Sequence, residues 1–165
     1  MGAVDYFLKM QGVEGETDDS VHRGEIEVES WSFGESQAGT SMYGKGSGTG
    51  RVSMQDFMFT KRMDKASPKL ALYCCNGQVT QECLLTARKA GGASGPQEYF
   101  RVRFKDVIIS SYQTTGSAST DIVPREQITF NFTAVEFEYR VQNPETGQLG
   151  GPIKAGYNLV ENRKV

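Results

Sequence analysis

Histidine and cysteine are scarce in this 165-residue sequence, which contains one histidine, His22, and three cysteines. Because the cysteine count is odd, Cys74, Cys75 and Cys83 do not make a disulfide framework, and we expect three reduced thiols. The cysteines lack the C-x-x-C spacing of a zinc site, and a cupin-like metal barrel needs several clustered imidazoles. The sequence therefore predicts no metal site and no bound cofactor.

Long apolar runs and an excess of one charge are also absent. No apolar stretch approaches the ~20 residues needed to cross a bilayer, which predicts no membrane insertion. The first ten residues, MGAVDYFLKM, show no basic region followed by an apolar core, so we expect no cleaved signal peptide and synthesis in the cytoplasm. The 18 Lys and Arg against 20 Asp and Glu give a net charge of −2, which lacks the basic footprint of a nucleic-acid-binding protein.

A nucleotide-binding loop is missing as well. The glycine-rich stretch SQAGTSMYGKGSGTG, residues 36–50, fails as a Walker loop because Lys45 is followed by Gly46 and not by Ser or Thr. The spacing of Gly46, Gly48 and Gly50 is GxGxG, whereas the dinucleotide fingerprint is GxGxxG. Both fingerprints also require a following helix, and a strand-like pattern follows here. We therefore expect no phosphate site in this loop.

No catalytic set can be assembled from the remaining polar residues. His22 lies in DDSVHRGE, a polar connection, and is predicted to be a solvated loop histidine. Glu25, Glu27 and Glu29 share one face of a strand and could resemble a paired-carboxylate site. We predict a solvated strand face instead, because nothing apolar beside them would raise a carboxyl pKa. The sequence therefore predicts that the protein is not an enzyme.

Alternation of apolar and polar residues dominates the chain and predicts a mainly β protein. The clearest segment is ITFNFTAVEFEYRV, residues 128–141, in which the apolar parity changes near Thr133 and Ala134. One extra residue in a β-bulge at that point would keep a single apolar face. The predicted strands cover residues 4–10, 24–33, 51–61, 79–89, 100–112, 128–141 and 153–160.

One segment, SPKLALYCCNG, has helical spacing instead. Ser67 is placed to cap a helix, Pro68 suits its first position, and Gly77 suits its end. Leu70 and Tyr73 would then share the buried face. Many strands with one short helix indicate a barrel or a sandwich, and no repeat or linker divides the chain.

Taken in order, these segments resemble one family, the haemolysin-coregulated (Hcp) proteins of bacterial type VI secretion systems. AVDYFLKMQGVEGETDDSVHRGEIEVESWSFGESQAG resembles the first two strands of that family and their connection. GRVSMQDFMFTKRMDKASPKL is similar to its third strand and helix start, LTARKAGG to its mid-chain strand and turn, and GGPIKAGYNL to its C-terminal strand. The resemblance spans essentially the whole chain and implies a single tube-subunit domain over residues 1–165.

The resemblance implies a β-barrel of two sheets with one short flanking α-helix, and an assembly of six copies in a ring. Rings of this family stack into a tube that a contractile sheath drives out of the cell behind a spike, the valine-glycine repeat protein. Small effector proteins ride in the channel, so the ring also acts as their chaperone. A chain of this kind is cytoplasmic before firing and secreted afterwards. The number six comes only from the family.

The resemblance also assigns surfaces to particular residues. The glycine-rich segment corresponds to an arm that contacts the next subunit or ring, with Met42 and Tyr43 as its sizeable apolar groups. The turn KAGG corresponds to one rim of the ring, ENR to the opposite rim, and Ser32 to a channel-facing contact for effectors. The residues assigned in this way are Thr40, Ser41, Met42, Tyr43, Gly44 and Lys45 in the arm, Lys89, Gly91, Gly92, Glu161 and Arg163 on the rims, and Ser32 in the channel.

Two alternatives stay open at this point. The arm can be an ordinary polar hairpin with two incidental apolar residues, and Ser32 an ordinary surface serine. The chain as a whole can be a monomeric β-barrel module that binds a small ligand or a carbohydrate. Solution mass separates this module from a ring.

Overall fold

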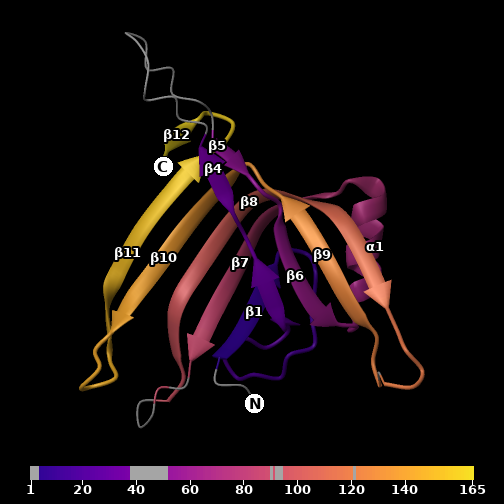
Figure 1. The fold of residues 1–165 in the computed structure, drawn as a ribbon, viewed down its shortest axis with the longest axis horizontal. Helices are drawn as coiled ribbons and strands as arrows, with labels where there is room; N and C mark the ends of the chain where they lie inside the picture. The colour runs from indigo at the N-terminus through magenta and orange to yellow at the C-terminus, as the bar shows by residue number, and fades with distance from the viewer. Residues whose placement is uncertain (1–3, 38–51, 90, 92–94, 121) are drawn as a thin grey trace.

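The computed structural model describes residues 4–37, 52–89, 91, 95–120 and 122–165, and it is mainly β with one helix, as predicted (Figure 1). No helix among these residues is long and apolar enough to cross a membrane. The elements are β1 (Val4–Met10), β2 (Ile26–Val28), β3 (Ser30–Ser32), β4 (Glu35–Gln37), β5 (Val52–Met54), β6 (Phe57–Arg62), α1 (Ser67–Asn76), β7 (Val79–Lys89), β8 (Gln97–Thr115), β9 (Arg125–Asn131), β10 (Ala134–Gln142), β11 (Leu149–Asn158) and β12 (Arg163–Lys164).

The long strand β8 organises two β layers. Its first half pairs with β10 and β7 in a large sheet of order β12-β11-β10-β8-β7-β1-β2. Its second half pairs with β9, which continues through β6 to β3. Asp106, near the middle of β8, has a φ of 49°, a left-handed conformation that helps the strand change direction. The small β3-β6-β9 layer therefore packs over part of the large sheet, and α1 lies on the flank (Figure 1).

Three strands predicted as continuous are broken. The predicted strand 24–33 is β2 and β3, which pair with β1 and β6 respectively, and 51–61 is β5 and β6. The predicted bulge in 128–141 is wrong, because the chain leaves one strand at Phe132 and starts another at Ala134. Both strands pair with β8, and the Thr133 amide donates to the Lys105 carbonyl between them. The change of parity therefore marks a change of layer.

The core is aromatic where the layers meet. Phe57, Phe59, Phe104 and Phe130 are fully buried, and the ring centroids of Phe57 and Phe104 lie 4.9 Å apart. Such tilted and edge-on contacts add to the free energy gained by burying the rings. Trp31 stacks on the edge of this cluster.

The start of the helix differs from the prediction. Ala66 is the N-cap, and Ser67 is the first helical residue, whose hydroxyl accepts from the Asp64 amide at 3.0 Å. Pro68 is the second helical residue, one position later than predicted, and its missing N–H costs nothing in the first turn. Gly77 ends the helix with a φ of 66° and donates to the Tyr73 carbonyl, as predicted.

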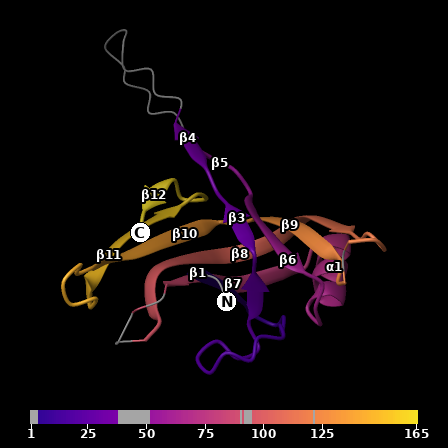
Figure 2. The same cartoon turned by 60° about the horizontal axis from the view of Figure 1, so that its bottom comes forward.

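A two-stranded hairpin leaves the body of the molecule. β4 and β5 pair only with each other among the described residues and rise away from the two layers (Figure 2). The predicted arm, which includes Thr40–Lys45, connects them and lies outside the described residues. The connection 14–25 and the end of β7 lie at the opposite end of the molecule (Figure 1).

Candidate assembly and cargo surfaces

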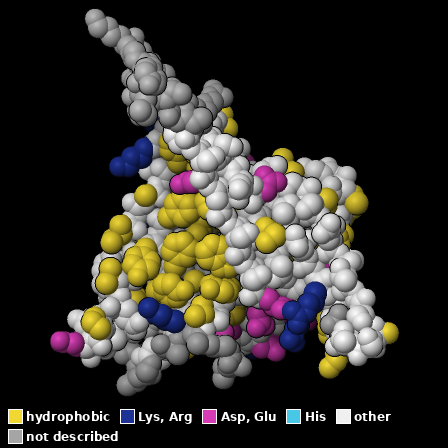
Figure 3. Space-filling model, in the orientation of Figure 1, with side chains coloured by type: hydrophobic (Ala, Val, Ile, Leu, Met, Phe, Trp, Pro, Cys, Tyr) yellow, Lys and Arg dark blue, Asp and Glu magenta, His cyan; other side chains and the backbone are white. Residues whose placement is uncertain are grey.

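The large sheet has an apolar face that the small layer covers only in part. Along β10 and β11 this face carries Tyr139 opposite Ile153, with Val141 farther along β10. These side chains are 43%, 62% and 54% exposed. Figure 3 shows the result as a gathering of hydrophobic side chains on one side of the molecule. We call the set Phe137, Tyr139, Val141, Ile153 and Ala155 the open apolar face.

The open apolar face continues the core. Phe33, directly after β3, reaches Phe137 with ring centroids 5.7 Å apart, and Trp31 stacks on Phe100 at 6.0 Å. β10 continues beyond Phe137 to the exposed Tyr139 and Val141. Contiguous apolar surface of this kind is unusual on a monomer and marks an interaction site.

A shallow groove joins this face to the base of the arm. Met54 and Val52 of β5 line one side of it, and Phe137, Ala155 and Tyr157 line the other. Its volume is about 280 Å³. The hairpin and the open apolar face therefore form one continuous surface.

The outward face of the small layer is different, because its centre is polar and uncharged. Ser32 is exposed there and pairs with Met58, whose neighbour on β9 is Thr129. Two residues before Ser32 on β3, the hydroxyl of Ser30 forms a hydrogen bond with the hydroxyl of Thr60 on β6. Trp31 points the other way, toward the core, as alternation requires. We call Ser30, Ser32, Met58, Thr60, Gln127 and Thr129 the hydroxyl face.

Two of the predicted rim residues belong to strands at opposite ends of the molecule, since β7 ends at Lys89 and β12 begins at Arg163 (Figure 1). Lys89 ends β7 with its ammonium 4.8 Å from the centre of the Tyr99 ring. A Cβ on Gly91 would lie 1.8 Å from the Gly95 carbonyl oxygen, so the turn accepts only glycine there. Gly92 lies outside the described residues. Glu161 and Arg163 form an exposed ion pair at the other end.

The prediction for His22 is wrong, because the imidazole is buried. It stacks on Phe7 with centroids 4.4 Å apart, while Nδ1 and Nε2 face Glu25 and Glu98 at 2.7 and 2.5 Å. Glu25 is therefore a hydrogen-bond partner of a buried ring and does not line a solvated face. No sequence pattern marks this contact, since it joins residues 76 positions apart.

A second buried network lies under α1. Lys61 and Glu126 are fully buried and pair at 2.7 Å, and Lys61 also donates to Asp64 at 2.8 Å. Ser67 donates to Glu126, and so does the Tyr112 hydroxyl. Burial and this hydrogen bond raise the pKa of Tyr112 to about 12. The alternation of the sequence could have predicted this buried pair. Lys61 is in step with the inward-facing Phe57 and Phe59 on β6, and Glu126 is in step with the inward-facing Ile128 and Phe130 on β9.

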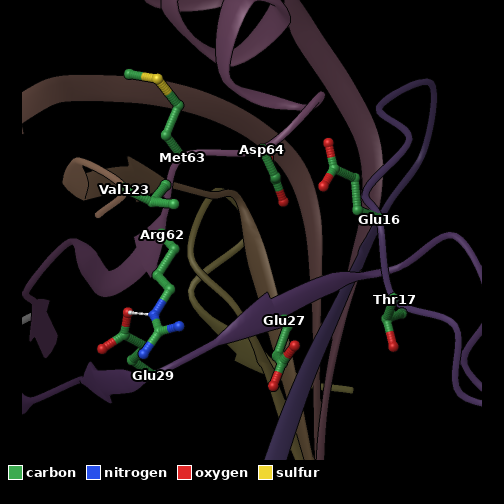
Figure 4. Close-up of a pocket in the computed structure, with 8 residues that line it drawn as sticks. All are labelled: Glu16, Thr17, Glu27, Glu29, Arg62, Met63, Asp64 and Val123. Atoms are coloured by element: carbon green, nitrogen blue, oxygen red, sulfur yellow. Dashed lines mark ion pairs between the residues drawn. The ribbon is translucent and has the colours of Figure 1, made fainter. Parts of the chain in front are cut away.

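Four carboxylates line the cleft drawn in Figure 4, those of Glu16, Glu27, Glu29 and Asp64. Arg62, also in its lining, forms an ion pair with Glu29 at 3.5 Å. Glu29, which lies between β2 and β3, also accepts from Arg125, and both Glu27 and Glu29 are exposed as predicted. Across the described part of the chain, no three metal-ligating side chains come close enough to hold an ion.

Comparison with known proteins gives the family. Residues 7–139 match the family model described as type VI secretion system effector, Hcp. The chain is also 41% identical over 160 residues to the protein hcp1 of Pseudomonas aeruginosa, covering 97% of this chain and 98% of the relative. The chain belongs to the Hcp family.

Solved Hcp structures share the whole fold. The crystal structure of Hcp1 from Salmonella typhimurium is 35% identical and superposes with a TM-score of 0.82 over 99% of this chain and all of that one. A structure of a type six secretion system protein is 33% identical, with a TM-score of 0.89 and the same coverage. The Hcp resemblance seen in the sequence is confirmed, and the family match over residues 7–139 includes the hydroxyl face and, of the open apolar face, Phe137 and Tyr139.

Proposed function

We propose that this Hcp chain is the structural subunit of a type VI secretion tube. In this proposal six copies close into a ring, and the rings stack into an inner tube surrounded by the contractile sheath and tipped by the spike protein. The chain is made in the cytoplasm and leaves the cell with the tube. We assign it no catalytic step.

The open apolar face carries this proposal. Its residues continue the apolar core past the edge of the small layer, so a neighbouring copy can complete the burial that one chain leaves unfinished. Burying a side chain such as Ile153 or Tyr139 contributes about 1.5–3 kcal/mol, and the contribution recurs at every contact of a ring. A face that docks onto a different surface of the next copy gives a head-to-tail contact, which closes when the rotation per copy permits. The number six rests on the family.

The arm and the rims have roles between rings in this proposal. The hairpin β4–β5 leaves one end of the molecule, and β7, whose last residue is Lys89, ends at the other (Figure 1). Stacked copies would therefore bring the arm of one ring toward the opposite rim of the next. Met42 and Tyr43 are the apolar groups of the arm that would anchor it.

The hydroxyl face is the proposed cargo surface. Hydroxyl and amide groups both donate and accept hydrogen bonds, and they repel neither sign of charge. A channel lined by such groups suits effector proteins of different composition. Ser32 is an exposed member of this face on its edge strand, β3, which supports its assignment as a cargo contact.

The experiment that tests the proposal is native mass spectrometry of the purified chain at micromolar concentration. The expected mass is about 109 kDa, six times the 18.2 kDa chain. A predominant species of 18.2 kDa would contradict the ring and favour a monomeric ligand-binding module.

A further inference from the structure

The sole histidine of the chain fastens a connection onto the large sheet. The connection 14–25 joins β1 to β2 and crosses the outward face of the large sheet, where it covers Phe7. His22 lies between Phe7 beneath it and two carboxylates, Glu25 of the connection itself and Glu98 at the start of β8. The imidazole is only 7% exposed, so water competes weakly for these contacts.

Both ring nitrogens face carboxylate oxygens, and this fixes the protonation state that satisfies them. A carboxylate only accepts hydrogen bonds, so two such contacts need two N–H donors, which only the imidazolium possesses. A neutral ring has one N–H and one lone pair, and the lone pair would face a carboxylate at 2.5 or 2.7 Å. Losing the proton therefore turns one attractive contact into a repulsive one.

The surrounding charges favour the same state. Arg88 of β7 pairs with Asp5 of β1 and with Asp19 of the connection, and Arg101 of β8 pairs with Glu98. The side chains around the ring therefore carry four carboxylates, counting Glu25, and two guanidiniums. A positive imidazolium lowers this local excess of negative charge. Burial acts to raise the pKa of Glu98, but the hydrogen bonds from Arg101 and His22 outweigh it and hold that pKa below its usual value.

We propose that His22 is a pH-sensitive latch that holds the connection 14–25 on the large sheet when protonated and releases it when neutral. The folded state offers the charged ring two carboxylate partners that the unfolded chain lacks. The contribution of the latch is therefore present while the ring carries both protons, at acidic pH, and is lost at alkaline pH, where the ring is neutral.

Three backbone hydrogen bonds report the state of the latch. Within the connection the Gly15 amide donates to the Gly24 carbonyl at 2.8 Å, the Gly24 amide to Thr17 at 3.0 Å, and the Thr17 amide to Glu25 at 3.3 Å. These amides are protected from hydrogen exchange only while the connection is closed. If the proposed function holds, the connection also forms part of the end that meets the next ring, and stacking would inherit the same pH dependence.

The test is amide hydrogen exchange on the purified chain at pH 6 and pH 8, corrected for the intrinsic effect of pH on exchange. Losing one charge-assisted hydrogen bond should lower the protection of the Gly15, Thr17 and Gly24 amides about tenfold at pH 8. His22→Gln should show the low protection at both pH values. The control Arg23→Gln removes a neighbouring exposed charge and should keep the wild-type response.

The single imidazole gives a second readout in the wild-type protein, which needs no variant to fold. Its nitrogen NMR signals should show both nitrogens protonated at pH 6 and one at pH 8, in step with the change in exchange. Equal protection at the two pH values, or a pH response retained in His22→Gln, would overturn the latch. Neither readout requires a ring, so a monomeric protein would overturn the proposed function and leave this test intact.

Discussion

Lys61 brings a positive charge to a fully buried position beneath α1, where Glu126 and Asp64 accept its hydrogen bonds. Lys61→Met should lower the free energy of unfolding by about 3–5 kcal/mol, because it leaves the Glu126 carboxylate buried without its cation. The double variant Lys61→Met with Glu126→Leu should recover most of this loss, since an apolar pair needs no charge balance.

Urea unfolding at fixed subunit concentration measures both changes. Arg62→Met is the matched control, because Arg62 is 70% exposed and its ion pair with Glu29 is at the surface. Its effect should stay below about 1 kcal/mol. If Lys61→Met lowered the free energy of unfolding by no more than Arg62→Met does, the buried Lys61–Glu126 pair would contribute little to stability.

The three thiols differ in accessibility, which gives a second prediction at the scale of single residues. Cys83 is buried in the core, and burial raises the pKa of its thiol, whereas Cys75 is exposed on α1. Because the thiolate is the reactive form, iodoacetamide should modify Cys75 quickly and Cys83 only after unfolding. Mass spectrometry of peptides from the labelled native protein gives the order. Equal labelling of the two would mean that the core opens readily.

At the scale of elements, alternation predicts where strands are but not where they change partner. The parity change near Thr133 was visible in the sequence, and its meaning as a change of layer depends on β8, which lies 18 or more residues earlier. The burial of His22 likewise depends on Glu98. Local patterns report which face of a strand is apolar, whereas pairing between distant strands is set by the whole sheet.

At Gly15 the start of the connection 14–25 passes close to the backbone at its end. A Cβ there would lie 2.2 Å from the Glu25 carbonyl oxygen, so Gly15→Ala should destabilise the protein by about 1–3 kcal/mol. Gly116→Ala is the control, since its Cβ would meet Pro124 at an ordinary 3.6 Å. Thermal unfolding followed by circular dichroism should show a lower midpoint for the first variant alone. Equal midpoints would mean that the backbones of Gly15 and Glu25 lie farther apart than the structure shows.

The arm is the element that we expect to act between subunits without supporting the fold of one subunit. Shortening or altering a long connection changes loop-closure entropy only slightly. Met42→Ser with Tyr43→Ser should therefore keep the β-rich circular dichroism spectrum and the thermal midpoint, while ring stacking and tube-dependent secretion fall sharply. Normal stacking and secretion would make the arm a connector only.

At the scale of the whole molecule, the large sheet is wider than the layer that covers it. The sequence resemblance predicted a ring, but it did not locate the contact between copies, because Tyr139 and Ile153 read as ordinary inward strand positions. Only the register of β10 and β11 places them side by side on the face that the small layer leaves open. The open apolar face is thus a property of the assembled sheet.

The central claim is that copies associate through this face, and solution mass of two double variants tests it most directly. Tyr139→Gln with Ile153→Gln makes the open apolar face polar. Glu138→Gln with Lys154→Gln is the matched control, because these residues pair one step along on the same strands and point to the opposite face. We predict a mass near 109 kDa for wild type and control, and 18.2 kDa for the Tyr139 and Ile153 variant. A Tyr139 and Ile153 variant that folds and keeps the ring mass would contradict the account.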